Sequence, residues 1–173
     1  VGLVVLGSGG VAPLSAGAGR GQLRRVLDSL ARIQPGTQIY RDEKRTAAGL
    51  LSRVPAGAVL LVLTPAISDT ALTRAATLAR RGLGVVVVDT LPAAATAARL
   101  SVADLFAIAP LRRVRDVAPT RLAWWLRLLE RDGQLRRLRE QGLPVVRWTG
   151  PGSLDDVLRQ LRRRARAPRM VRR

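Results

Sequence analysis

The architecture of this chain follows from an unbroken apolar run, Ala58-Val-Leu-Leu-Val-Leu63. The run shows no alternation of apolar and polar residues, which is typical of a strand buried on both faces in a parallel sheet. A second run, Val85-Val-Val-Val88, has the same pattern. The segment between the runs predicts a helix that begins at Ser68 or Asp69 and ends at Arg81, before a glycine. Together these elements predict a strand–helix–strand unit.

Similar elements flank this unit on both sides. Short apolar runs predict strands at Val1–Leu6 and Pro144–Trp148. Helical spacing and capping residues predict further helices at Gly21–Ile33, Asp42–Arg53, Thr120–Gln141 and from Ser153 onward. The side of the longest helix that we expect to pack inward carries Leu122, Trp125, Leu126, Leu129, Leu135 and Leu138. The alternation of strands and helices predicts an α/β fold with a doubly wound, mostly parallel sheet and helices on both faces.

The composition excludes several classes of site. The 173 residues include no Cys and no His. Disulfides, His-based catalytic triads and His/Cys zinc sites are therefore excluded within this chain. Lys and Arg total 30 against 12 Asp and Glu, which gives a formal net charge of +18. This charge favours an anionic partner, nucleic acid or phospholipid head groups, although codon usage in a GC-rich genome would produce the same arginine excess.

We expect a single domain over residues 1–161, with an irregular insertion at 93–119 where proline and alanine interrupt short helical patterns. Residues 162–173 carry seven arginines and no acidic residue, which predicts a disordered tail. Four of these arginines are candidate contacts for an anion or a membrane surface: Arg162, Arg163, Arg164 and Arg166. No stretch is long and apolar enough for a membrane-spanning helix.

Two acidic residues follow predicted parallel strands. Asp69 and Asp89 would lie at the carboxyl edge of the sheet, where open α/β sheets bind their ligands. Two carboxylates there could hold a divalent cation, but Asp69 would serve equally well as a helix cap. A nucleotide site is not favoured, because Gly7-Ser-Gly-Gly10 lacks the third glycine of the dinucleotide fingerprint and no P-loop motif is present.

Three ordered segments carry a family resemblance. They are Val1-Gly-Leu-Val-Val-Leu-Gly7 with Gly19-Arg-Gly-Gln-Leu-Arg-Arg-Val-Leu-Asp28, Pro55-Ala-Gly-Ala-Val-Leu-Leu-Val-Leu-Thr-Pro65 with the second valine run, and Leu138-Arg-x-x-Gly-Leu-Pro-Val-Val-Arg-Trp148 with Gly152-Ser-Leu-Asp-Asp-Val-Leu158. In this order they resemble the C-terminal part of bacterial domain-of-unknown-function family fifty-eight, a von Willebrand factor type A-like family. The actinobacterial members are the most similar.

The resemblance implies a sheet with strand order 3-2-1-4-5-6, whose first strand ends in a metal-binding Asp-x-Ser-x-Ser motif. That motif is absent here, and Val88-Asp89-Thr90-Leu91-Pro92 is only a partial copy of it. We therefore expect the first, central strand to precede Val1. The strands at Val1–Leu6 and Ala58–Leu63 would then expose unpaired apolar edges or pair directly with each other.

The positions that the resemblance assigns to a metal are degenerate in this sequence. Thr64 stands where an Asp is expected, and Gly19-Arg-Gly-Gln22 stands where a Thr is expected. Together with Asp69 and Asp89, Thr64 is thus a site position without a full ligand set. We expect no cofactor and no metal; a divalent cation such as Mg²⁺ would need the upstream motif.

The resulting interpretation is a non-enzymatic protein-interaction domain. The resemblance implies the cytoplasmic part of a membrane-anchored bacterial protein, anchored through segments outside this chain, with a MoxR-type AAA ATPase as a partner. A basic α/β nucleic-acid-binding module is the alternative. An enzyme is not favoured, because Thr64, Asp69 and Asp89 have no recognisable base or oxyanion-binding group beside them in the sequence.

Overall fold

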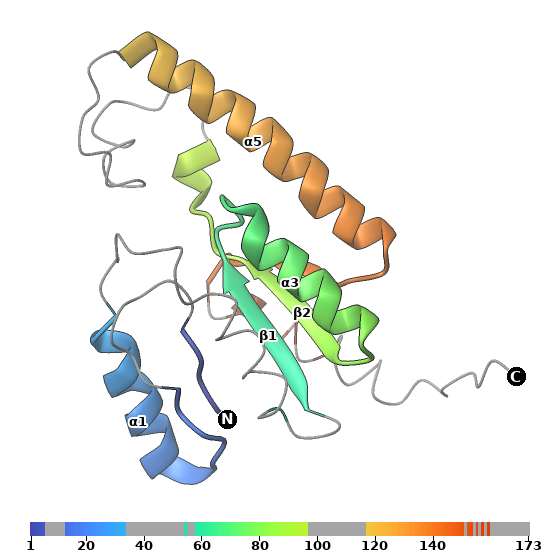
Figure 1. The fold of residues 1–173 in the computed structure, drawn as a ribbon. Coiled ribbons are helices and arrows are strands. Elements are labelled where there is room, and N and C mark those ends of the chain that lie inside the picture. Colours follow the sequence, from blue (N-terminus) through green and yellow to red (C-terminus); the bar gives the residue numbers. More distant parts are fainter. Residues whose placement is uncertain are drawn as a thin grey trace, which may run out of the picture. The chain divides into compact units, whose positions relative to one another are not determined.

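The computed structural model describes residues 1–5, 13–33, 54, 58–96 and 117–150, together with residues 152, 153, 155, 157 and 159 (Figure 1). The chain divides into two compact units, Val1–Ala56 and Gly57–Arg173. The predicted helix at 42–53, residues 97–116 of the predicted insertion and the arginine tail at 162–173 lie outside the described residues. A single domain over residues 1–161 stays a prediction.

A three-stranded parallel sheet forms the centre of the second unit (Figure 1). Its strands are β1 (Val59–Thr64), β2 (Gly84–Asp89) and β3 (Val145–Arg147), in the spatial order β1-β2-β3. The register pairs the last residues of neighbouring strands with one another. All three strands therefore end at one edge of the sheet, and the prediction of an α/β fold with a parallel sheet is confirmed.

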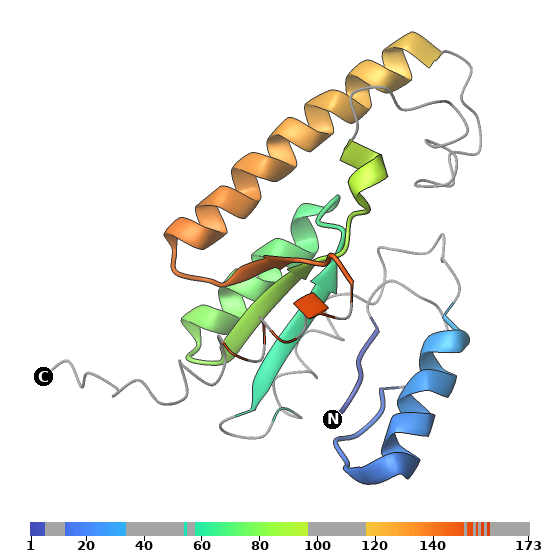
Figure 2. The same cartoon turned by 180° about the vertical axis from the view of Figure 1, so that it is seen from behind.

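Helices cover both faces of β2. On one face, Val85 and Val87 share a core cluster with α3 (Asp69–Arg80) and α5 (Val117–Glu140). On the other face, Val86 and Val88 pack against Val157, which belongs to a helical segment near the C-terminus. Seen from behind in Figure 2, the sheet stands in front of α3. The uninterrupted valine run is thus buried on both faces, as its pattern predicts.

The strand β1 differs from its prediction. Its pattern predicts burial on both faces, yet Val59, Leu61 and Leu63 are 47%, 36% and 63% exposed. Only the intervening residues Leu60 and Val62 pack against the core cluster. The reason is its position. β1 is an edge strand of the described sheet, and among the described residues the cluster on the far face joins Val157 to β2 and β3 and includes no residue of β1.

The termini of α3 follow the expected capping chemistry. The Ser68 hydroxyl accepts a hydrogen bond from the Thr70 backbone N–H at 3.4 Å and is the N-cap. After the last turn, Gly82 adopts a φ of +85°, the left-handed conformation that glycine tolerates best. Both ends of this helix are therefore confirmed.

Two other predicted caps are wrong. Helix α5 begins at Val117, three residues before the predicted cap Thr120. Pro119 does not prevent this, because the first-turn N–H groups of a helix have no intrahelical partner. Ser153 is itself helical, and its hydroxyl accepts from the Thr149 N–H at 3.3 Å. It therefore supports the turn before the helix from inside the first helical turn.

The prediction of which side of α5 packs inward is wrong over the first half of the helix. The half-buried Trp124 and the buried Leu128, Arg131, Leu135 and Leu138 face the rest of the unit at alternating spacings of four and three. The predicted residues Leu135 and Leu138 belong to this side, whereas the other predicted residues are exposed: Leu122, Trp125, Leu126 and Leu129. Apolar residues lie on two sides of this half of the helix, so periodicity alone could not identify the packed one.

The first unit is organised around Gln22 of α1 (Gly19–Ala31). Its side-chain amide donates hydrogen bonds to the carbonyls of Val1 at 2.7 Å and Ser15 at 2.9 Å. An isolated antiparallel bridge joins Leu3, in the apolar segment predicted at Val1–Leu6, to Leu14. The expected buried strand at the N-terminus is not seen in its described part, since Val1 is 83% exposed and residues 3–5 are only half-buried.

Candidate functional site

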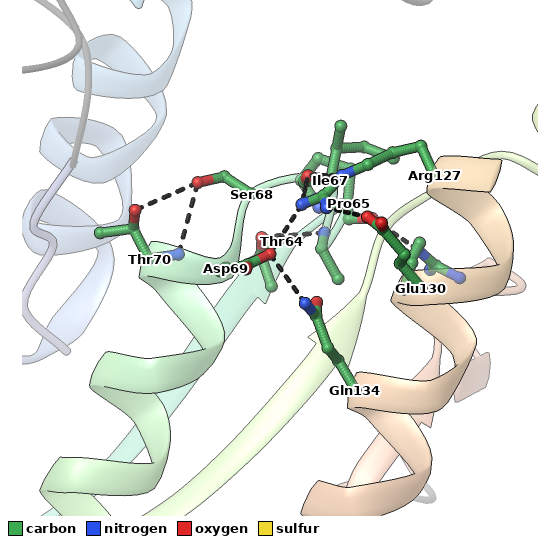
Figure 3. A network of polar contacts seen from close by, with 11 residues as sticks. Thr64, Pro65, Ile67, Ser68, Asp69, Thr70, Arg127, Glu130 and Gln134 are labelled. Carbon is green, nitrogen blue, oxygen red and sulfur yellow. Dashed lines mark hydrogen bonds and ion pairs between the residues drawn. The ribbon is translucent and has the colours of Figure 1, made fainter. Parts of the chain in front are cut away.

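The candidate site lies at the carboxyl edge of the sheet, where the β1–α3 loop faces α5 (Figure 3). Thr64 and Asp89 are register partners at the ends of β1 and β2, and Asp69 is the first residue of α3. The structure therefore brings all three sequence-predicted positions to one edge. The side chains around them were not predicted: they are two arginines of α5, Arg127 and Arg131.

A buried ion pair occupies the centre of this edge. The Arg131 guanidinium donates to the Asp89 carboxylate, and the two side chains are only 4% and 8% exposed. Arg131 also donates from Nε to the Pro65 carbonyl at 2.9 Å and from Nη1 to Asp132 at 3.2 Å. The Asp89 oxygen accepts a further hydrogen bond from the Leu91 N–H at 3.1 Å. Both charges are thus compensated by several polar groups, which burial of an ion pair requires.

One helical turn earlier, Arg127 forms a second, more exposed set of polar contacts, which we call the Arg127 clamp (Figure 3). Its guanidinium donates to the Ile67 carbonyl, from Nε at 2.6 Å, and to the Asp69 carboxylate at 2.7 Å. It also pairs with Glu130 at 2.7 Å, and the Gln134 amide donates to the same Asp69 oxygen at 2.8 Å. Helix α5 therefore holds the start of α3 through hydrogen bonds from two side chains.

These contacts shift the titration of Asp69. Hydrogen bonds from Arg127 and then from Gln134 stabilise its charged form and hold the pKa of this carboxyl below its ordinary value of 3.8. The same hydrogen bond from Arg127 to Asp69 raises the pKa of the guanidinium. Asp69 is therefore an anion at neutral pH and already has two hydrogen-bonded partners.

The loop between β1 and α3 is shaped to present its carbonyl groups to these arginines. The Thr64 hydroxyl accepts from the Ala66 N–H at 3.0 Å. Ala66 is fully buried and has a φ of +55°, which is costly for a residue with a Cβ. This tight turn points the Pro65 carbonyl toward Arg131. The hydroxyl of Thr64 stabilises the turn through its hydrogen bond with the backbone of the loop.

The arrangement changes what the predicted metal positions can do. Arg131 pairs with Asp89 and Arg127 pairs with Asp69. The guanidinium groups therefore already neutralise the two carboxylates that a metal cation would bind. Within the described residues, no group of three acidic side chains could hold a metal ion. The candidate anion contacts Arg162, Arg163, Arg164 and Arg166 lie outside the described residues.

The sequence does contain a signal for the contacts that Arg127 and Arg131 make. Arg127 and Arg131 are four residues apart, and Arg131 falls at a core position of the helical pattern formed by Leu128, Leu135 and Leu138. An arginine in a core position needs a buried acidic partner. The partner, Asp89, is 42 residues away in the sequence, so the pair could be proposed from the pattern but not located without the fold.

The chain was compared with protein-family models, curated proteins and solved structures, and none of them matches it. Among the helices that the structure describes, none is both long enough and apolar enough to span a membrane.

We expect the substitution Arg131→Met to destabilise the second unit by about 3–5 kcal/mol, because it leaves the Asp89 carboxylate buried without its cation. Urea denaturation followed by circular dichroism would measure this change in the free energy of unfolding. The double variant Arg131→Met/Asp89→Asn should recover part of the loss, because no charge then stays buried. A cost below about 1 kcal/mol for the single variant would contradict the buried pair.

The contribution of Asp69 to stability should depend on pH. A carboxyl with a depressed native pKa stabilises the fold above its unfolded pKa, and this stabilisation is lost as the pH falls through the native pKa. The wild type should therefore be more stable than Asp69→Asn at pH 7, and the difference should disappear as the pH falls below the ordinary value of 3.8. Thermal unfolding of both proteins across this range would measure it. A difference that persisted unchanged to pH 2 would contradict the Arg127 clamp.

Proposed function

We propose that this chain is a non-enzymatic protein-interaction domain that recognises its partner at the carboxyl edge of the sheet. The observation that supports this most directly is that each of the three polar side chains at this edge already has a bonding partner within the chain. Asp69 and Asp89 are paired with arginines, and the Thr64 hydroxyl bonds to the loop backbone. A general acid, base or nucleophile has to be available to a substrate, whereas these groups serve to rigidify the edge.

A rigid edge is well suited to recognition, because little conformational entropy is lost when a partner binds. An exposed aromatic residue lies beside it: Trp148 is 38% exposed, and its backbone N–H donates to the Asp89 carbonyl at 2.8 Å. Trp residues are enriched among those that dominate binding energy at protein interfaces. Pro65 and Pro92 are further exposed residues in the loops at the same edge.

The resemblance described above supplies the proposed setting and partner. We propose a von Willebrand factor type A-like fold, and the order β1-β2-β3 agrees with strands 4-5-6 of that arrangement. In this proposal the chain belongs to a membrane-anchored bacterial protein, faces the cytoplasm and binds a MoxR-type AAA ATPase. It uses no cofactor or metal, because guanidinium groups neutralise the two carboxylates.

We expect saturable binding between the full chain and a purified MoxR-type AAA ATPase encoded in the same genome. Trp148→Ala should weaken this binding by about tenfold or more, as removal of a central aromatic contact does. Val59→Ala is the matched control, because Val59 is an exposed apolar residue at the opposite end of β1. Biolayer interferometry would measure all three affinities. Equal losses for both variants, or no binding by the wild type, would contradict the proposal.

Nucleic-acid binding is the alternative, and the charge distribution favours it as the second candidate. The net charge is +18, and the described arginines at one end of the chain are exposed on and just after α1: Arg20, Arg24, Arg25 and Arg32. Such surfaces bind the phosphate backbone without sequence preference.

Salt dependence distinguishes the two functions. Binding to DNA or RNA through six to ten phosphate contacts would weaken by about 10³–10⁵ between 50 and 200 mM salt. We expect binding to the ATPase to weaken far less over the same range, because aromatic and backbone contacts are not screened by salt. Fluorescence anisotropy with a labelled oligonucleotide, for the full chain and for a chain lacking 162–173, would show whether the alternative holds and whether it needs the tail.

A further inference from the structure

Helix α5 has a second apolar side, which is exposed. Leu122, Trp125, Leu126 and Leu129 are 62%, 46%, 53% and 61% exposed. At 100° per residue they form a stripe about 100° wide on one side of the helix, which we call the α5 stripe. The packed side, through Trp124 and Leu128, is a different one. The exposed stripe is therefore the result of the helix rotation that the buried Arg131 requires.

The stripe is symmetric along the helix. Leu122 and Leu129 stand at equal distances from a point midway between Trp125 and Leu126. A two-fold axis at this point, perpendicular to an antiparallel pair of α5 helices, places Leu122 level with Leu129 of the second copy. It also places Trp125 beside its own equivalent, and Leu126 beside its own equivalent, each offset by about 1.5 Å along the axis. A self-complementary surface of this kind is what an isologous dimer interface needs.

The charges beside the stripe are complementary in the same arrangement. Arg121 and Asp132 lie eleven residues apart, which puts them within about 20° of each other around the helix. They flank the stripe on the same side, and in the antiparallel pair Arg121 comes within about 3 Å along the axis of the second copy's Asp132. Asp132 accepts a hydrogen bond from Arg131 at 3.2 Å, but its side chain is 65% exposed and so is open to a further cation. The pairing thus sets opposite charges together twice, in a chain whose net charge of +18 would make most other surfaces repel one another.

From the symmetry and the charge pairing, we propose that the α5 stripe is the docking surface for a second copy of this chain, in an antiparallel two-fold helix pair. A membrane surface fits less well, because Glu130 and Asp132 flank the stripe and anionic lipids repel carboxylates. The surface is small compared with a stable interface of about 800 Å² per partner, so the dimer is weak and reversible. The proposal does not depend on the proposed function, since it involves α5 and not the Trp148 edge.

Engineered cysteines test the register directly, because the natural chain has no Cys. Leu122→Cys and Leu129→Cys should each give little disulfide-linked dimer alone, because each residue is about 10 Å from its own equivalent along the axis. An equal mixture of the two variants should give a linked heterodimer of two chains under mild oxidation, resolved by non-reducing electrophoresis. Leu126→Cys alone should give a linked homodimer. Linkage that is equal in all four experiments, or absent from all, would overturn the two-fold arrangement.

Sedimentation equilibrium of the untreated chain provides an independent measurement. We expect the apparent mass to rise from 18.7 kDa toward twice that value as concentration increases. Leu126→Glu should abolish the rise, because it sets two carboxylates together at the axis. Arg139→Glu, an exposed change on the same helix outside the stripe, should leave it intact. Circular dichroism should be unchanged in both variants. A wild type that stays monomeric, or that binds anionic vesicles through Leu126 without self-associating, would overturn the proposal.

Discussion

The buried pair of Arg131 and Asp89 is the interaction on which the rest of the second unit depends. It sits between two apolar clusters, one around Leu128 and one around Leu135 and Leu138, and so lies in the middle of the packed side of α5. Such a pair costs desolvation free energy, and it is tolerated because the Pro65 carbonyl and further polar groups complete its hydrogen bonds. The pair determines where α5 lies along the sheet and how it is rotated.

Several features follow from this constraint. Because Arg131 must reach the end of β2, α5 turns Leu128 inward and leaves the α5 stripe exposed. Because Arg131 and Arg127 each bind a carbonyl of the β1–α3 loop, the loop adopts a tight turn with Ala66 in a left-handed conformation. The same contacts engage the carboxylates at the sheet edge. The edge that resembles a cation-binding site in sequence is therefore, in the structure, one whose two carboxylates are paired with arginines.

The preference for arginine over lysine has a structural use here. A guanidinium is planar and has five N–H donors, so Arg131 can bind a carbonyl, a buried carboxylate and a neighbouring carboxylate at once. The Arg127 guanidinium likewise donates to a backbone carbonyl and to two carboxylates at once. A lysine ammonium carries its three donors on one atom and could not span these acceptors. Whatever produced the arginine-rich composition, the side chains of Arg127 and Arg131 hold the fold of the second unit together.

The sequence by itself determined the three strands of the described sheet, the caps of α3 and the α/β class, because apolar runs and capping residues act over short distances. The strand expected at Val1–Leu6 was not among them. It also brought Thr64, Asp69 and Asp89 to one edge, since parallel strands end together. It could not determine which side of α5 packs, because both sides are apolar over the first half. Nor could it show that one face of β1 is partly exposed or that arginines neutralise the acidic edge. Those outcomes were decided by contacts between residues tens of positions apart, as with Asp89 and Arg131, and such contacts exist only once the tertiary structure has formed.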